Sequence, residues 1–172
     1  MAYGLYKRIA APRARAVAVG LALTAALSGP AYALTCPVSG EQNSLAVRAL
    51  QSKLMVAALS CSAQNDYNRF VRLYKPHLAD HAGSLRQWFR KLHGKGYRRE
   101  INRFVTLLAN DASMRSIGDR GAFCAASQDA FSALLRASRL EAPSTLRAVA
   151  FETNWRRDVP AGCTVQTQNA KE

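Results

Sequence analysis

Residues 43–62 read NSLAVRALQSKLMVAALSCS and carry the clearest helical pattern in the chain. Apolar side chains recur there at intervals of three and four, which places them along one side of an α-helix. Asn43 or Ser44 stands before the run and offers a side-chain oxygen to the first free backbone N–H groups. The pattern therefore predicts a helix that ends near Ser62. Its predicted buried side chains are Val47, Leu50, Leu54, Ala57, Ala58 and Cys61.

The same spacing continues outward from this helix towards the C-terminus. Further helices are predicted at about residues 66–78, 78–92, 101–118 and 122–140. Pro76 should end or kink the first of these because proline has no backbone N–H, and Gly94 and Gly96 should end the second. Residues 145–151 fit either a short helix or an extended segment. No alternating stretch is long enough for a β-sheet, so we expect an all-α antiparallel bundle of about five helices.

The first 33 residues have a different character and predict a cleaved leader. A basic start with Lys7 and Arg8 precedes an apolar run over residues 16–27, and the leader ends in the A-x-A pattern of Ala31-Tyr-Ala33. The run is shorter than the roughly 20 residues that span a bilayer. We therefore expect residues 1–33 to be a signal peptide, with an uncleaved anchor or a lipoprotein as weaker alternatives.

Cleavage after Ala33 would leave one helical domain over residues 34–165 and a flexible polar tail over residues 166–172. No transmembrane segment would remain. The predicted location is outside the inner membrane, in the periplasm.

The four cysteines all lie after the leader, and an even number in an exported chain favours two disulfides. Of the three possible pairings we favour Cys61 with Cys124, each on an inward helical stripe, and Cys36 with Cys163, which would join the two ends. Sequence alone does not decide between them. The absence of C-x-x-C argues against a thiol oxidoreductase, a zinc ribbon and covalent haem, and we expect no cofactor.

Positive charge is concentrated in one part of the chain. Of 24 Lys and Arg residues and 11 Asp and Glu residues, four bases and no acids fall in the leader, which leaves a net charge of +9. Ten bases and only two acids, Asp80 and Glu100, lie between residues 69 and 103. The bases are Arg69, Arg72, Lys75, Arg86, Arg90, Lys91, Lys95, Arg98, Arg99 and Arg103.

Such a cluster could be a solvated helical face that keeps the protein soluble, or a face that attracts anions. For the second reading we select the seven bases from Arg86 to Arg103 as the predicted anion-binding residues. Their expected partners are anionic envelope lipid, lipopolysaccharide, an acidic wall polymer or an envelope protein. Nucleic acid is disfavoured as a partner in an exported protein.

One short motif offers an enzymatic alternative. His77, Asp80 and His81 form H-x-x-D-H, which is similar to the inverted zinc-protease motif H-x-x-E-H with a shorter acid. The shorter arm and the basic surroundings disfavour a metal site, so we predict neither metal ligands nor catalytic residues. A hydrolase of cell-wall material or peptide, with or without a metal ion at these residues, remains the alternative to a binding protein.

Several stretches together resemble an uncharacterised group of small exported helical proteins of Gram-negative bacteria. They are LQSKLMVAALSC at residues 50–61, YNRFV at 67–71, NRFVTLLAN at 102–110 and FC at 123–124. The resemblance supports the pairing of Cys61 with Cys124. It implies no activity for any residue, and a non-enzymatic exported protein with a basic binding face remains the preferred prediction.

Overall fold

The chain divides into two units, Met1–Ala33 and Leu34–Glu172. A computed structural model describes residues 39–153, all of which belong to the second unit. The predicted signal peptide at residues 1–33, the predicted tail at 166–172 and the pair Cys36 and Cys163 lie outside the described residues.

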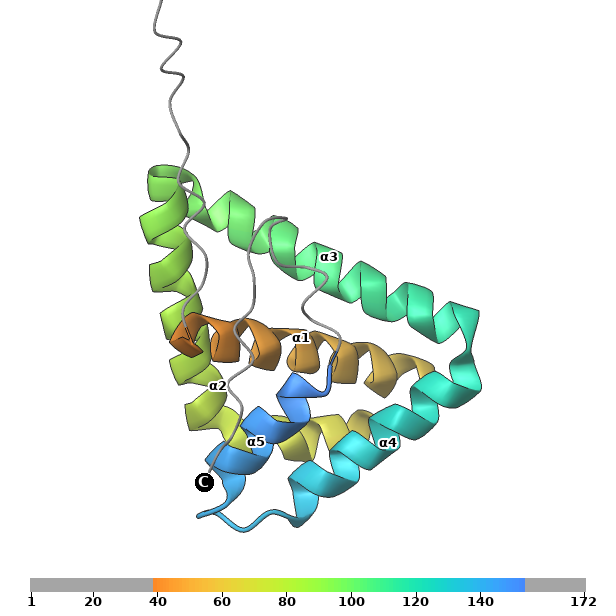
Figure 1. The fold of residues 1–172 in the computed structure, drawn as a ribbon. Helices are drawn as coiled ribbons and strands as arrows, with labels where there is room; N and C mark the ends of the chain where they lie inside the picture. The colour runs from red at the N-terminus through yellow and green to blue at the C-terminus, as the bar shows by residue number, and fades with distance from the viewer. Residues whose placement is uncertain (1–38, 154–172) are drawn as a thin grey trace, which may run out of the picture. The chain divides into compact units, whose positions relative to one another are not determined.

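The described part of the chain consists of helices joined by short connections (Figure 1). In chain order the elements are α1 (Ser39–Ser60), α2 (Gln64–His93), the 3-10 helix η1 (Gly94–Gly96), α3 (Tyr97–Gly118), α4 (Arg120–Arg136) and α5 (Ala142–Phe151). No β-strand occurs within residues 39–153, so the predicted all-α class is confirmed there. None of these described helices is both long enough and apolar enough to cross a membrane.

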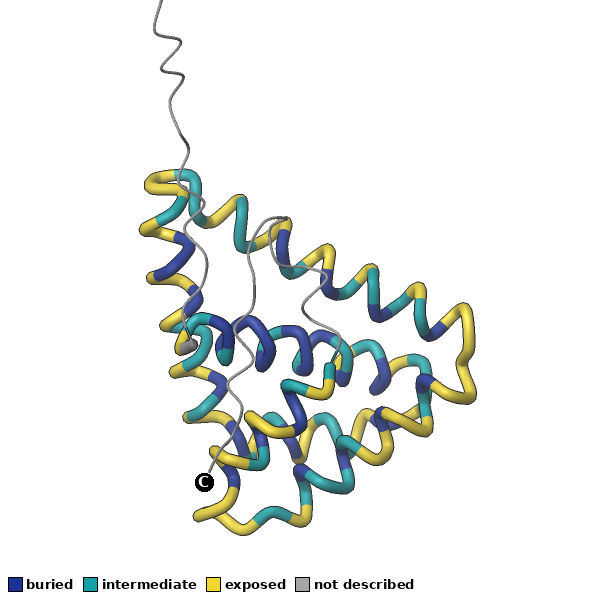
Figure 2. The backbone as a smooth tube through the Cα atoms, in the orientation of Figure 1, coloured by how far each residue is buried: buried dark blue, intermediate teal, exposed yellow. Residues whose placement is uncertain are grey.

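Helix α1 lies in the middle of the fold and packs against α2, α3, α4 and α5 (Figure 1). Figure 2 shows most of its residues as buried or intermediate. The predicted inward residues Val47, Leu50, Leu54, Ala57 and Ala58 are all buried, and so are Leu45, Ala46 and Ala49. The core is therefore built around this helix. Burial of each of its large aliphatic side chains contributes about 1.5–3 kcal/mol.

Helix α2 continues through Pro76, so of the predicted end or kink at this residue the end is wrong. Figure 1 shows that α2 changes direction between its first and second halves. A proline inside a helix costs about 3 kcal/mol because a backbone hydrogen bond is lost. The apolar stripe continues on both sides of Pro76, with Tyr74 and Leu78 buried next to it. Burial of several such side chains outweighs the cost of the proline. The two helices predicted at residues 66–78 and 78–92 are therefore one helix.

The end of α2 agrees with the glycine pattern. The helix ends at His93, and Gly94 adopts a φ of 51° while its N–H donates to the carbonyl of Arg90. Residues with a side chain rarely adopt this left-handed conformation, whereas glycine adopts it readily. The turn through η1 places the first residues of α3 beside the end of α2.

Helices α4 and α5 complete the core. The buried hydroxyl of Tyr74 donates to the carbonyl of Leu134 at 2.9 Å. This carbonyl lies in the last turn of α4, where no intrahelical partner exists. Tyr74 therefore caps α4 although it is 60 residues away in the sequence. The open choice at residues 145–151 is resolved as the helix α5, which has Pro143 in its first turn, a position that needs no N–H.

A disulfide joins Cys61, just after α1, to Cys124 in α4, the pairing favoured from the sequence. The two Cα atoms are 5.5 Å apart, and the residues are separated by 63 positions in the chain. At the same junction the guanidinium of Arg120 donates to the carbonyl of Ser60. The end of α1 is thus attached to the beginning of α4 by a covalent bond and a hydrogen bond.

Candidate anion-binding site

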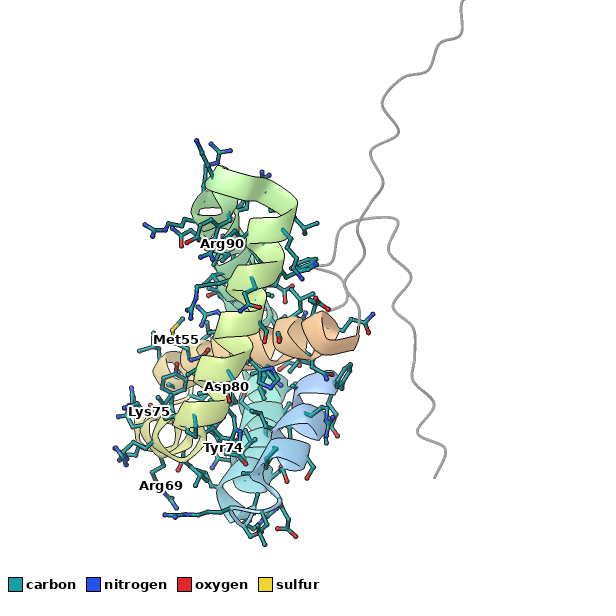
Figure 3. All side chains as sticks on the ribbon, turned by 90° about the vertical axis from the view of Figure 1, so that its left-hand side faces the viewer. Met55, Arg69, Tyr74, Lys75, Asp80 and Arg90 are labelled. Carbon is teal, nitrogen blue, oxygen red and sulfur yellow. A yellow bond between two sulfur atoms is a disulfide. The ribbon has the colours of Figure 1, made fainter. Side chains whose placement is uncertain are left out.

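The ten bases between residues 69 and 103 do not form one continuous face. Arg69, Arg72 and Lys75 lie on the first half of α2, whereas the other seven lie on its second half, on η1 and on the first turns of α3. Figure 3 shows Arg69 and Lys75 near one end of α2 and Arg90 near the other. The nearest members of the two groups, Lys75 and Arg86, are eleven residues apart in α2, which is about 16 Å along the helix. This exceeds the screening length of about 8–10 Å at physiological salt, so the two groups are partly screened from each other.

Tyr97 organises two of these seven residues. Its phenol oxygen accepts hydrogen bonds from Arg90 Nη2 at 3.3 Å and from Arg98 Nε at 3.2 Å. The guanidinium carbons of Arg90 and Arg98 also lie 4.9 Å and 5.8 Å from the centre of its ring, within the range of a cation–π contact. Because Arg90 belongs to α2 and Arg98 to α3, Tyr97 holds cations from two helices side by side.

The two arginines change the acidity of this tyrosine. Hydrogen bonds from Arg98 and then Arg90 favour the phenolate and lower the pKa of Tyr97 to about 8. The same contact raises the pKa of Arg98 above its ordinary value. Below about pH 8 the phenol is neutral, so both guanidiniums keep an uncompensated positive charge.

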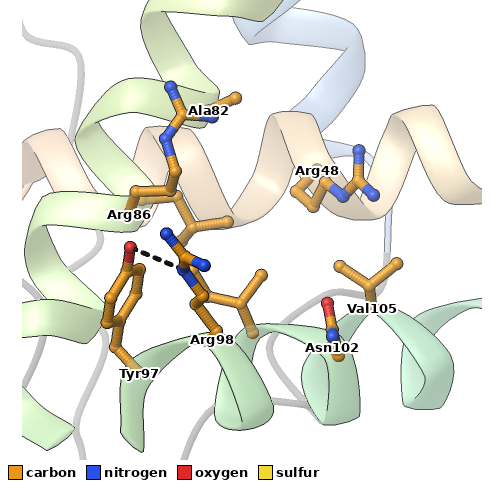
Figure 4. Close-up of a pocket in the computed structure, with 9 residues that line it drawn as sticks. Arg48, Ala82, Arg86, Tyr97, Arg98, Asn102 and Val105 are labelled. Atoms are coloured by element: carbon orange, nitrogen blue, oxygen red, sulfur yellow. Dashed lines mark hydrogen bonds between the residues drawn. The ribbon is translucent and has the colours of Figure 1, made fainter. Parts of the chain in front are cut away.

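A pocket of about 410 Å³ lies beside Tyr97, between α1, α2 and α3 (Figure 4). Three arginines from three helices line it: Arg48 from α1, Arg86 from α2 and Arg98 from α3. The remaining lining residues are Ala82, Leu85, Tyr97, Ile101, Asn102 and Val105. No carboxylate is among these described lining residues. We call this site the arginine pocket.

Arg48 is the arginine that sequence reasoning missed. Its side chain is half-buried, and Nη1 donates to Gln51 Oε1 at 2.8 Å. Burial lowers the pKa of Arg48 because the charged form loses hydration. None of the ion pairs found among residues 39–153 includes Arg48. An amide therefore takes the place that a carboxylate usually has beside a half-buried guanidinium.

Five of the seven predicted anion-binding residues do not line this pocket. Lys91 and Lys95 are exposed, and Arg99 forms an ion pair with Glu100 at 3.1 Å. Arg103 lines a second pocket, of about 430 Å³, whose walls include Trp88, Phe89, Phe104 and Leu107. Of the seven predicted residues, Arg86 and Arg98 line the arginine pocket and Arg90 is bound to its Tyr97.

The motif His77, Asp80, His81 lies in the middle of α2. His81 is half-buried, its Nδ1 lies 3.1 Å from Ser44 Oγ, and burial lowers the pKa of His81. The ring of His77 lies 6.3 Å from that of Tyr74. Within residues 39–153 no group of three His, Cys, Asp or Glu side chains is placed to hold a metal ion. His81 is therefore part of the contact between α1 and α2.

The arginine pocket carries groups that suit the recognition of an oxyanion. Each guanidinium offers five N–H donors in a planar arrangement that matches the oxygens of phosphate and carboxylate. The described lining residues include no Ser, Cys, His, Asp or Glu, and Tyr97 is the one lining side chain among them with a pKa near neutrality. No protein-family model, no curated protein and no solved structure matches this chain.

Proposed function

We propose that this protein is exported to the periplasm and binds an anionic component of the cell envelope through the arginine pocket. One observation carries the proposal: three arginines from three different helices line a single pocket in which no described residue supplies a negative charge. An oxyanion would supply that charge. The binding is non-enzymatic, and the partner is an anionic lipid, lipopolysaccharide, an acidic wall polymer or an acidic surface of an envelope protein.

The surroundings of the pocket favour the approach of such a partner. Four further bases are exposed and lie near Arg86 and Arg98 in the sequence, where they raise the local positive potential: Arg90, Lys91, Lys95 and Arg103. A concentrated positive potential increases the rate at which anions arrive, and salt weakens this attraction. Tyr97 also restricts the side chain of Arg98, because it accepts a hydrogen bond from that side chain at the pocket. Residues held in advance lose less conformational entropy when a ligand binds.

We further propose that the exported domain is an antiparallel helical bundle held by two disulfides. The bond between Cys61 and Cys124 supports this view, since it leaves Cys36 and Cys163 as the remaining pair. Mass mapping of peptides from the unreduced protein tests the pairing. A peptide that contains both Cys36 and Cys163 is expected, and free thiols at these two residues would contradict it.

Retention on isolated envelope components tests the binding. The oxidised protein that starts at Leu34 is mixed separately with anionic phospholipid vesicles, lipopolysaccharide and wall polymer, at low and at high salt. We expect retention on at least one of these fractions at low salt and its loss at high salt, because counterions screen the contact. Retention on neutral vesicles to the same degree would contradict the proposal.

A variant and a metal analysis complete this experiment. Replacing Arg90, Lys91, Arg98 and Arg99 together by Gln should remove retention and leave the helical content unchanged, since all four side chains are exposed. Unchanged retention by this variant would contradict the proposal. A lack of retention together with stoichiometric zinc in the wild-type protein would instead favour the hydrolase that uses His77, Asp80 and His81.

A further inference from the structure

The arginine pocket has an apolar side as well as a charged one. Leu85 is buried, and Ile101 and Val105 are half-buried, so part of their apolar surface faces the cavity that they line. Its volume of about 410 Å³ falls in the range of roughly 300–1,000 Å³ typical of pockets for small molecules. A purely ionic polymer would gain no binding energy from this apolar wall. The pocket therefore combines features that suit a small amphiphile.

We propose that the arginine pocket binds a single-chain amphiphile with a phosphate head group. The phosphate lies between Arg48, Arg86 and Arg98, and the apolar chain lies against Leu85, Ile101 and Val105. This assignment rests on the proposed anion-binding function and names the chemical class of its ligand.

The head group follows from the number and origin of the arginines. A phosphate monoester presents three terminal oxygens and carries more negative charge than a carboxylate, and each oxygen can accept hydrogen bonds from a guanidinium. Arginines from three helices stand on different sides of the pocket (Figure 4), so a phosphate has more than one guanidinium available to it, whereas a carboxylate is satisfied by one bidentate arginine. Asn102 also lines the pocket and offers amide N–H donors.

Arg48 gives the head group its place within the pocket. It has already lost much of its hydration, so an anion that reaches it gains more from the contact than one at an exposed cation. Arg48 lies on α1, the helix at the centre of the core, and its guanidinium is positioned by Gln51. Arg48 is thus the half-buried arginine of the pocket, whereas Arg86 and Arg98 are exposed.

Titration with a series of alkyl phosphates tests the proposal, with calorimetry below the micelle concentration of each compound. Inorganic phosphate should bind weakly. Each added methylene should tighten binding by up to about fourfold until the chain fills the pocket, because burial of a methylene contributes about 0.8 kcal/mol. Fatty acids of equal chain length should bind less tightly than the phosphates. Higher affinity for the fatty acids would overturn the assignment of the head group.

Two substitutions test the phosphate and the apolar chain of the ligand separately. Arg48→Gln should weaken every alkyl phosphate by about tenfold or more, as expected for the loss of a charge-assisted hydrogen bond. Val105→Thr keeps the shape of the side chain and adds a hydroxyl, so it should weaken the long-chain compounds and leave inorganic phosphate unaffected. Val71→Thr is the control, because Val71 is also half-buried but does not line the pocket.

The outcomes distinguish this inference from the function on which it rests. Affinity that is independent of chain length, together with retention on anionic envelope fractions, would overturn the amphiphile and leave the anion-binding function standing. Absence of binding to every phosphate and every envelope fraction would overturn both. Equal effects of Val105→Thr and Val71→Thr would place the apolar chain elsewhere and overturn the site.

Discussion

Helix α1 and the α2–α3 end of the molecule are built in opposite ways. Along α1 most side chains are buried, and its apolar residues contact all of the other long helices. At the α2–α3 end, from Arg86 to Arg103, nearly every cation is exposed, and contacts with Tyr97 hold two of them in place. The difference indicates that the apolar core and most of the proposed binding residues lie in separate parts of the molecule, so we expect surface mutations to affect the proposed binding with little loss of stability.

Arg48 is the point at which the two regions meet. It belongs to α1 but lines the arginine pocket with Arg86 and Arg98. A cation on a core helix is costly unless something compensates its charge, and Gln51 does so only in part. The site therefore depends on the core for the position of its innermost arginine.

The largest expected effect concerns the disulfide at the end of α1. Replacing both Cys61 and Cys124 by Ala should lower the free energy of unfolding by about 4 kcal/mol, because the crosslink restricts a loop of some 63 residues in the unfolded chain. Denaturant titration of the oxidised wild type and the double variant measures this difference. A loss below about 1 kcal/mol would show that the bond does not stabilise the core.

A pair of leucines on α1 tests the asymmetry of that helix. Leu54 is fully buried, and Leu54→Ala should cost about 3 kcal/mol through lost burial and the cavity left behind. Leu59 is 73% exposed, and Leu59→Ala should change the stability by less than about 0.5 kcal/mol. Equal losses in chemical denaturation would contradict the placement of the core.

The hydroxyl of Tyr74 offers a smaller effect in the same core. Tyr74→Phe removes the donor to the carbonyl of Leu134 and leaves that buried carbonyl without its cap. We expect a loss of about 1–2 kcal/mol with no change in helical content. Tyr67→Phe is the control, since Tyr67 is only half-buried. If both variants lose the same stability, the hydrogen bond from Tyr74 has no special role.

The smallest effect on stability is expected at Tyr97. Its pKa is lowered to about 8, so ionisation is easier in the folded protein than in the unfolded chain. The contact with the arginines therefore adds most to stability above about pH 10, and this contribution is lost as the pH falls through 8. Phenolate absorbance should show one tyrosine ionising near pH 8, absent in Tyr97→Phe and shifted towards 10 in a variant with Arg90→Gln and Arg98→Gln. Ionisation of Tyr97 near pH 10 in the wild type would contradict the contact.

The sequence predicted the core of α1 well because that helix follows one periodic pattern. Leu50, Leu54 and Ala57 are buried where their spacing placed them. An end or a kink at Pro76 was predicted from a local rule, and the end is wrong because apolar burial continues on both sides of the proline. A proline inside a helix costs about 3 kcal/mol. The burial of several large apolar side chains contributes more than this.

The arginine pocket could be predicted only in part. The density of bases pointed to Arg86 and Arg98, but the pairing of helices that brings Arg48 to them is a tertiary feature. A signal was nonetheless present, since Arg48 is the only charged residue between Glu41 and Lys53 and has apolar residues on both sides. Two equally basic stretches of α2 also look alike in sequence, and only the fold shows that they lie at different ends of the helix.

The most direct test of the central claim compares two variants with the same loss of charge. One carries Arg86→Gln and Arg98→Gln in the arginine pocket, and the other carries Arg72→Gln and Lys75→Gln at the opposite end of α2. Their affinities for anionic phospholipid vesicles are measured at one salt concentration. If the pocket binds the anion, the first variant should lose about tenfold or more in affinity and the second less than about twofold. Equal losses would show that net charge alone governs binding and would contradict a site at the arginine pocket.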